Sequence, residues 1–134
     1  MNLYDKDIYN EPNQYRIILI DKYRGIGFRL VALASHPCAY IKISYDKVKP
    51  FEDELPCHFG LSYEGDYPLD QLDEESGWIG WDYGHALDYI NCRGNDFEEL
   101  NKGNKKWTLE EIICEIKETI DFILDNAKKT NENV

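Results

Sequence analysis

A regular stripe of branched apolar side chains near the C-terminus constrains this fold most. The stripe runs from Thr108 to about Asn126 and repeats with the three- and four-residue spacing that puts side chains on one face of an α-helix. Its members are Leu109, Ile112, Ile113, Ile116, Ile120, Ile123 and Ala127. Thr108 and Glu111 match the capping box that begins a helix. The apolar face predicts that this helix packs against a second layer, with Ile116 and Ile120 at the centre of the contact.

Several other positions of the predicted helix are charged. Glu115, Lys117, Glu118 and Asp121 are expected to face outward from the apolar stripe or to flank it. Trp107 stands just before the helix, where an aromatic residue is typical of a hydrophobic staple, and we favour that role over contact with a ligand.

Upstream of the helix, runs of β-branched and aromatic residues predict strands. The predicted strands span residues 15–21, 26–33, 39–45, 57–64 and 78–83. The first two are close enough to form a hairpin, and the third alternates apolar and polar side chains as a half-buried strand does. The fold class is therefore α+β: an antiparallel sheet of about four to five strands with one long C-terminal helix packed across it.

The length of 134 residues fits one domain. We expect a flexible arm over residues 1–14, a single α+β domain over residues 15–127 and a polar tail over residues 128–134. Residues 46–56 and 91–106 are predicted as loops, and the second is long enough to cover a pocket.

Acidic residues outnumber basic residues by 26 to 15, which gives a formal net charge of −11. A field of this sign repels polymeric nucleic acid and anionic membranes, so neither is expected as a partner. Single arginines can still hold a small anion locally. The candidates are Arg16, Arg24, Arg29 and Arg93.

Composition also indicates the compartment. No apolar run is long enough to cross a bilayer, and the first residues lack the pattern of a signal peptide, so we expect a cytoplasmic protein. Cys38, Cys57, Cys92 and Cys114 are widely spaced without a Cys-x-x-Cys pair. This spacing predicts reduced, mostly buried thiols instead of a zinc cage or a redox pair, and no cofactor is expected.

The segment from Gly77 to Tyr89 holds the densest group of chemically capable side chains. It has two tryptophans, two tyrosines, two aspartates, a histidine and three glycines within thirteen residues. Asp82, His85 and Asp88 recur at every third position, directly behind a predicted strand. Such a composition is typical of the wall of a ligand pocket.

Three interpretations of these polar residues are open. In a structural role, Asp82 accepts backbone hydrogen bonds at a turn and His85 caps a short helical turn. In a binding role, the same side chains contact a ligand. In a chemical role, His58 meets Asp82 or His85 across neighbouring strands, and the three hold a metal ion or form an acid–base set.

For the aromatic residues, a role in the core and a role in a pocket are both open. Trp78 and Trp81 are three positions apart in a strand and should therefore point to opposite faces of the sheet. Phe59, Tyr63, Tyr83 and Tyr89 either belong to the core or stack on a planar ring of a ligand. The acidic residues between positions 64 and 75 form a solvated loop or, alternatively, imitate a phosphate backbone.

A sequence signature in four parts, given below, is matched in the same order by residues 36–37, 58–63, 77–88 and 107–111. On these pieces the chain resembles small proteins of unassigned role carried by bacteriophages and prophages. Their signature reads His-Pro, then His-Gly-Gly-Leu-Thr-Tyr, then Trp-Trp-x-Gly-Phe-Asp-x-Ala-His-x-Gly-Asp, and ends in an acidic helix opened by Trp or Tyr. The likeness covers roughly residues 27 to 127. Phe59, Ser62 and Leu87 depart from it, since they stand where the signature has glycine, threonine and glycine.

The resemblance implies a genetic setting. Small acidic phage proteins with an aromatic pocket fit the role of counter-defence factors, and one such strategy is to bind a nucleotide immune signal of the host and hold it. The leading hypothesis is therefore a protein of the bacterial cytoplasm that sequesters a small nucleotide-like ligand for immune evasion. A homo-oligomer is the expected assembly.

Each predicted ligand-binding residue has a role in this hypothesis. The aromatic residues sandwich the base, the histidines and aspartates hold ribose or amide groups, and Arg29 or Arg93 pairs with phosphate. The complete predicted set is His58, Phe59, Tyr63, Trp78, Trp81, Asp82, Tyr83, His85, Asp88, Arg29 and Arg93.

Two other functions are open. The chain could be a hydrolase of a nucleotide signal, with His58, Asp82 and His85 as metal ligands or as an acid–base set. It could also be an acidic interaction protein that imitates nucleic acid and occupies a binding cleft of a host defence protein.

Overall fold

The computed structural model describes residues 16–32, 36–65, 77–85, 87–88 and 101–132. In this part of the chain an antiparallel sheet of five strands has the order β1-β2-β3-β5-β4. The strands are β1 (Arg16–Tyr23), β2 (Ile26–Ala32), β3 (Pro37–Ile41), β4 (Tyr63–Gly65) and β5 (Trp78–Asp82). The helical elements are α1 (Tyr45–Val48), the short 3-10 helix η2 (Lys49–Glu54) and α3 (Leu109–Glu132).

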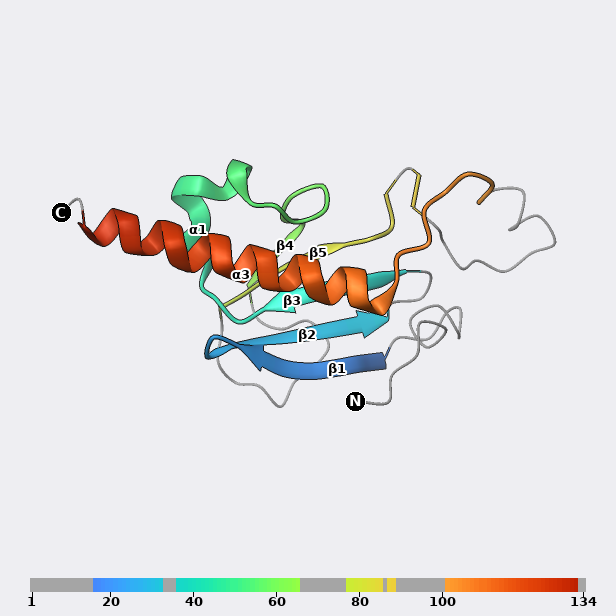
Figure 1. Ribbon diagram of the computed structural model, residues 1–134, viewed down its shortest axis with the longest axis horizontal. Helices are drawn as coiled ribbons and strands as arrows, with labels where there is room; N and C mark the ends of the chain where they lie inside the picture. Colours follow the sequence, from blue (N-terminus) through green and yellow to red (C-terminus); the bar gives the residue numbers. More distant parts are fainter. Residues whose placement is uncertain (1–15, 33–35, 66–76, 86, 89–100, 133–134) are drawn as a thin grey trace.

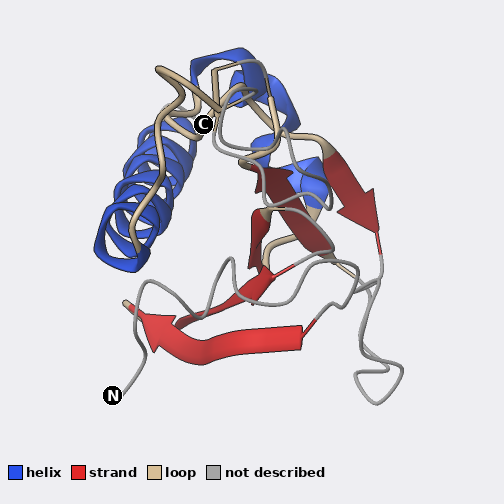
Figure 2. Ribbon diagram, turned by 90° about the vertical axis from the view of Figure 1, so that its right-hand side faces the viewer, coloured by secondary structure: helices blue, strands red, loops and turns tan. Residues whose placement is uncertain are grey.

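Helix α3 lies across one face of the sheet (Figures 1 and 2), which confirms the predicted α+β class. The predicted stripe is buried in the main core, with Ile112, Ile116 and Ile120 fully covered. The capping box is also present: the backbone N–H of Glu111 donates to Oγ1 of Thr108 at 3.1 Å, and that of Thr108 donates to Oε1 of Glu111 at 3.0 Å. The start of the helix and its buried face therefore follow from the sequence pattern.

The far end of α3 extends beyond the predicted limit. The helix continues to Glu132, so residues 128–132, which were predicted as part of a polar tail, are helical. Neither glycine nor proline interrupts this stretch, and polar residues alone do not end a helix. The predicted arm over residues 1–14 lies outside the described residues. No helix among the described residues has the length and apolar character that a membrane span requires.

Strands β1 and β2 form the predicted hairpin. Tyr23 pairs with Ile26, so the turn consists of Arg24 and Gly25, which have φ values of 51° and 80°. Two positive φ values in a two-residue loop match the turn that best fits the twist of paired strands. A bulge at Ile18 shifts the register of β1 near its start.

Two predicted strands differ from the structure. The third strand spans Pro37–Ile41 instead of 39–45, and the predicted loop at 46–56 holds the helical elements α1 and η2. The predicted strand at 57–64 is reduced to β4, because Phe59 and Gly60 have φ values of 58° and 76°. Extended strands require negative φ, so residues 57–62 form a turn instead.

The two faces of the sheet carry different clusters. Trp81 belongs to the main core beneath α3, whereas Trp78 is buried in a second cluster with Val31, Cys38 and Tyr40. The predicted opposition of Trp78 and Trp81 is confirmed.

Candidate functional site

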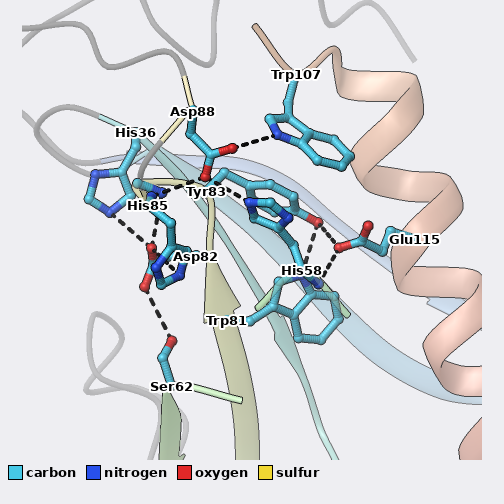
Figure 3. Close-up of polar contacts among 11 residues, drawn as sticks. His36, His58, Ser62, Trp81, Asp82, Tyr83, His85, Asp88, Trp107 and Glu115 are labelled. Atoms are coloured by element: carbon cyan, nitrogen blue, oxygen red, sulfur yellow. Dashed lines mark hydrogen bonds and ion pairs between the residues drawn. The ribbon is translucent and has the colours of Figure 1, made fainter. Parts of the chain in front are cut away.

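Strand β5 ends at Asp82, and the residues that follow turn toward the first turns of α3. His58 enters the same region from the turn before β4, and Trp107 enters it from the segment that leads into α3 (Figure 3). Together with His36, which precedes β3, polar and aromatic side chains from four distant parts of the chain therefore meet at one end of the sheet. We call this group the His/Asp cluster; it comprises His36, His58, Phe59, Ser62, Trp81, Asp82, Tyr83, His85, Asp88, Trp107 and Glu115.

Asp88 is the hub of one half of the His/Asp cluster. Its carboxylate is buried, and its Oδ2 lies 2.7 Å from Nε2 of His58. The same oxygen accepts the backbone N–H of His85 at 3.0 Å, and Oδ1 accepts the indole N–H of Trp107 at 3.0 Å. Three donors on a buried carboxylate fix its position and, through it, the orientation of the His58 ring.

The Tyr83 ring packs against one face of the His58 ring. The two rings are stacked with centroids 5.2 Å apart and an interplanar angle of 5°, and Trp107 lies 4.9 Å from both. The hydroxyl of Tyr83 accepts the indole N–H of Trp81 at 2.8 Å and donates to Oε1 of Glu115 at 2.9 Å. Burial, followed by the charge of Glu115, raises the pKa of Tyr83, so this hydroxyl is protonated and serves as a donor.

Glu115 connects α3 to the site. Its Oε1 accepts both the Tyr83 hydroxyl and, at 2.6 Å, the backbone N–H of His58. The apolar pattern of the helix predicted only an outward or flanking position for Glu115. Its position next to Ile116 at the border of the apolar stripe lets the long side chain reach over the stripe to two polar partners.

Asp82 organises the second half of the His/Asp cluster. Its Oδ1 lies 3.3 Å from Nε2 of His85 and 3.9 Å from Nε2 of His36, and it accepts the backbone N–H of Gly84 at 3.0 Å. Its other oxygen, Oδ2, accepts the hydroxyl of Ser62 at 3.2 Å. The predicted turn role of Asp82 is therefore present together with its contacts to two imidazoles.

His36 is held closely against the backbone that follows Asp82. A Cβ atom on Gly84 would lie 2.7 Å from Nδ1 of His36, so only glycine allows the ring this position. Burial lowers the pKa of His36, and the nearby carboxylate of Asp82 opposes that shift only in part.

Two apolar side chains at the His/Asp cluster are exposed: Phe59, which belongs to it, and Leu87, which lies beside it. Phe59 is 67% exposed and stacks on the His85 ring at 4.4 Å with an interplanar angle of 12°. Leu87 is 76% exposed and directly precedes Asp88. Both have left-handed backbones, with φ values of 58° and 73°. A side chain larger than glycine is strained there, and strained residues gather at functional sites. The phage signature has glycine at both positions.

The remaining predicted ligand residues lie elsewhere. Arg29 is 5.1 Å above the Trp78 ring, and Tyr63 packs against Tyr40 at 5.6 Å, so all of these belong to the second cluster on the other face. Arg93 lies outside the described residues, as does most of the acidic 64–75 stretch. The structure therefore brings together His58, Phe59, Trp81, Asp82, Tyr83, His85 and Asp88, and separates them from Tyr63, Trp78 and Arg29.

The charge around the His/Asp cluster is mostly negative. A shallow cavity of about 380 Å³ borders it and is lined by Trp107, Glu110, Glu111, Cys114, Glu115 and Glu118. Lys105 is the nearby cation: its Nζ lies 3.9 Å above the Trp107 ring and 2.7 Å from Oε2 of Glu111. Hydrogen bonding from Lys105 lowers the pKa of Glu111, which is therefore ionised at neutral pH. Within the described ranges, no three His, Cys, Asp or Glu residues are arranged to hold a metal ion.

Sequence reasoning missed four members of the His/Asp cluster. Glu115 carried no signal, and Ser62 belonged only to the 58–63 piece of the signature. His36 belonged only to the His-Pro piece of the signature. Trp107 was assigned to a staple, although its position before the capping box also brings its indole N–H to Asp88. Comparisons with protein-family models, curated protein sequences and solved structures gave no match. Fold and site together define an α+β domain with a cluster of histidine, aspartate and aromatic side chains at one end of its sheet.

Proposed function

We propose that this chain binds a small nucleotide-like molecule at the His/Asp cluster and sequesters it, as a counter-defence protein of the phage type would do. The observation that carries this proposal is the stack of His85 and Phe59 beside the His58–Asp88 pair. A flat, exposed ring next to oriented hydrogen-bonding groups is what recognition of a nucleoside requires.

The outer surface of Phe59 supports a stacking role. The ring covers His85 on one side, and most of its remaining surface faces solvent. A left-handed backbone makes phenylalanine costly here, whereas glycine would adopt the same turn without strain. A costly exposed ring is better explained by contact with a ligand than by a contribution to the fold.

The charges favour the nucleoside end of such a ligand. The side chain of Asp82 is 25% exposed and accepts hydrogen bonds, so ribose hydroxyls and exocyclic amino groups suit it, whereas the buried Asp88 acts by orienting His58. The acidic cavity beside Trp107 disfavours a phosphate at that point, whereas Lys105 lies at its rim. We therefore expect the base and the ribose to contact the His/Asp cluster while the phosphates point away from its carboxylates.

Titration calorimetry with ADP-ribose and with cyclic di-AMP tests the proposal. We expect at least one of them to bind. We expect Phe59→Gly to weaken that binding by about 5- to 150-fold, the equivalent of about 1 to 3 kcal/mol for one lost stack. The same variant should change the free energy of unfolding by less than about 1 kcal/mol, because relief of backbone strain offsets the lost contact with His85.

Asp53→Asn is the matched control, since Asp53 is exposed on η2 away from the His/Asp cluster. It should leave both binding and stability unchanged. If neither compound gives heat or a thermal shift, sequestration of a nucleotide signal is wrong.

A second candidate function, an acid–base hydrolase acting on the same class of molecule, is favoured by the His58–Asp88 pair. A buried carboxylate 2.7 Å from one imidazole nitrogen is how a general base is oriented, and Nδ1 of His58 makes no hydrogen bond to any described residue. In this candidate His58 takes the proton of an attacking water, and His85 protonates the leaving oxygen. Chromatography of ADP-ribose after incubation separates the two functions: products that disappear in His58→Asn favour hydrolysis, and intact compound released by heat favours sequestration.

A further inference from the structure

The outer edge of β1 is a second surface of interest, away from the His/Asp cluster. Strands β1 and β4 end the five-stranded sheet, and Figure 1 shows β1 along one margin of it. Strand β4 has three residues, whereas β1 has eight and is therefore about 26 Å long. Within the described part of the chain no strand pairs with the outer edge of β1, so this edge can accept a further strand.

Two exposed apolar side chains lie along this edge. Ile17 is 40% exposed and Ile20 is 60% exposed. Their partners in β2 are Val31 and Arg29, which both lie on the face of the sheet opposite α3. Residues directly opposite one another in neighbouring strands share a face. The edge therefore presents two exposed isoleucines on the same face.

The bulge in β1 explains the spacing of these isoleucines. In a regular strand, residues three positions apart point to opposite faces. The register shift between Ile17 and Leu19 adds one residue, and Ile18 and Leu19 both pack against the main core on the α3 side. A bulge ordinarily protects an edge, because a regular strand laid against it loses register at the extra residue. A strand with the same extra residue at the same place keeps its register on both sides of the bulge.

We propose that the outer edge of β1 pairs antiparallel with β1 of a second copy of this chain. In the proposed register, Ile17 of each copy faces Ile20 of the other. The two bulges, at Ile18 and Leu19, then lie opposite each other. No other antiparallel register brings every exposed isoleucine of this edge against an isoleucine of the second copy.

The order of charged residues favours the same register. Asp21 of each copy then faces Arg16 of the other, and these residues have opposite formal charge. A shift by one residue in one direction brings Lys22 opposite Arg16, and like charges directly opposite are destabilising. A shift in the other direction brings Ile20 opposite Arg16. A second copy supplies both members of each favourable pair, so it suits this edge better than an unrelated strand. The pairing does not depend on the proposed nucleotide function, since it shares no residue with the His/Asp cluster.

Sedimentation velocity of the whole chain, from micromolar to millimolar concentration, tests the proposal. The paired segment is short, so we expect a reversible equilibrium of monomer and dimer with a dissociation constant of about 10 to 100 μM. Ile20→Lys should raise this constant by about tenfold, because the contact of Ile20 with Ile17 is lost twice in each dimer. Leu87→Lys is the matched control, since Leu87 is an apolar side chain outside β1 with 76% exposure, and it should leave the constant unchanged.

A far-ultraviolet spectrum and a thermal midpoint like those of the parent chain establish that Ile20→Lys is folded. If it is not, Ile17→Lys tests the same contact from the other residue. A chain that stays monomeric up to millimolar concentration overturns the proposal. A dimer that Ile20→Lys and Ile17→Lys leave unaffected also overturns it, because its interface then lies elsewhere.

Disulfide crosslinking tests the register. Ile17→Cys and Ile20→Cys are made separately in a chain whose Cys92 and Cys114 are replaced by serine. On oxidation, we expect the mixture of the two variants to form a disulfide-linked dimer and each variant alone to form far less. Equal positions of the two copies lie three residues, or about 10 Å, apart along the paired strands, which exceeds the reach of a disulfide. Efficient crosslinking of either variant alone overturns the proposed register.

Discussion

The two ends of helix α3 pack against different kinds of surroundings. At the N-terminal end, Glu115 joins a network in which Asp88 accepts three hydrogen bonds and Tyr83 both accepts and donates one. At the C-terminal end, Ile123 and Leu124 border a cavity of about 620 Å³. One apolar stripe thus packs against a dense polar cluster at one end and an open apolar space at the other.

The difference follows from the length of the sheet. Where strands lie under α3, side chains such as Ile112 and Ile116 have a continuous floor and are fully buried. Where the strands stop, the floor is replaced by the short elements α1 and η2, which fill the space incompletely. Polar groups specify orientation and an apolar space supplies volume, so the two ends suit different classes of ligand.

The largest expected effect compares one substitution at the middle and at the far end of α3. Ile116→Ala removes a fully buried side chain and should lower the free energy of unfolding by about 2 to 4 kcal/mol. Leu124→Ala should cost only about 1 to 2 kcal/mol, because Leu124 is only partly buried beside the cavity and loses fewer contacts. Urea unfolding of both variants measures the difference. Equal costs would mean that the far end is as densely packed as the middle.

The elements with strong local patterns were predictable from sequence. Helix α3 has a seven-member apolar stripe and a capping box, and the first hairpin has two strand-length runs separated by Arg24 and Gly25. Both patterns are local in sequence, so they can be recognised without knowledge of the tertiary structure. The turn at 57–62 was mistaken for a strand because its composition favours strands, whereas the left-handed backbone of Phe59 excludes one.

The site was predictable only in part. Asp82, His85 and Asp88 were identified because they lie close together in sequence, and His58 because it begins a neighbouring strand-like run. Glu115 could not be identified, since its role depends on where α3 crosses the sheet. The cavity at the other end had no sequence signal at all, because it arises from the mismatch between the lengths of α3 and the strands.

The next largest effect is expected from breaking the polar end. Asp88→Asn removes the charge that three donors share and should lower the free energy of unfolding by about 1.5 to 3 kcal/mol. Asp125→Asn, in a side chain that is 64% exposed, is the control and should stay within about 0.5 kcal/mol of the parent. Chemical denaturation measures both. A loss at Asp88 no larger than at Asp125 would show that the carboxylate is not the hub of the His/Asp cluster.

A gain in stability is expected from a substitution at Leu87, which lies beside the His/Asp cluster. Leu87→Gly should raise the free energy of unfolding by about 1 kcal/mol, because glycine adopts a φ of 73° without strain and the side chain of Leu87 is mostly exposed. Arg24→Gly relieves similar strain but loses ion pairs to Asp121 and Asp125, so its gain should be smaller. Thermal and urea unfolding compare the two. Destabilisation by Leu87→Gly would mean that this side chain supports the fold.

The smallest effect is a pH dependence that sets the polar end apart from the apolar one. Burial lowers the pKa of His36 below its ordinary value of 6.5, and the facing groups Asp82, His85 and Asp88 adjust that shift. The unfolded chain therefore takes up a proton near pH 6.5 that the folded chain accepts only at lower pH. The stability that His36 contributes is complete above pH 6.5 and is lost as the pH falls below it.

Urea unfolding at pH 7.5 and pH 5.5 measures this loss of stability. The free energy of unfolding should fall less in His36→Gln than in the parent chain, and Lys47→Gln at the apolar end should leave the loss unchanged. An identical loss of stability in the parent and His36→Gln chains would mean that groups other than His36 cause the acid sensitivity.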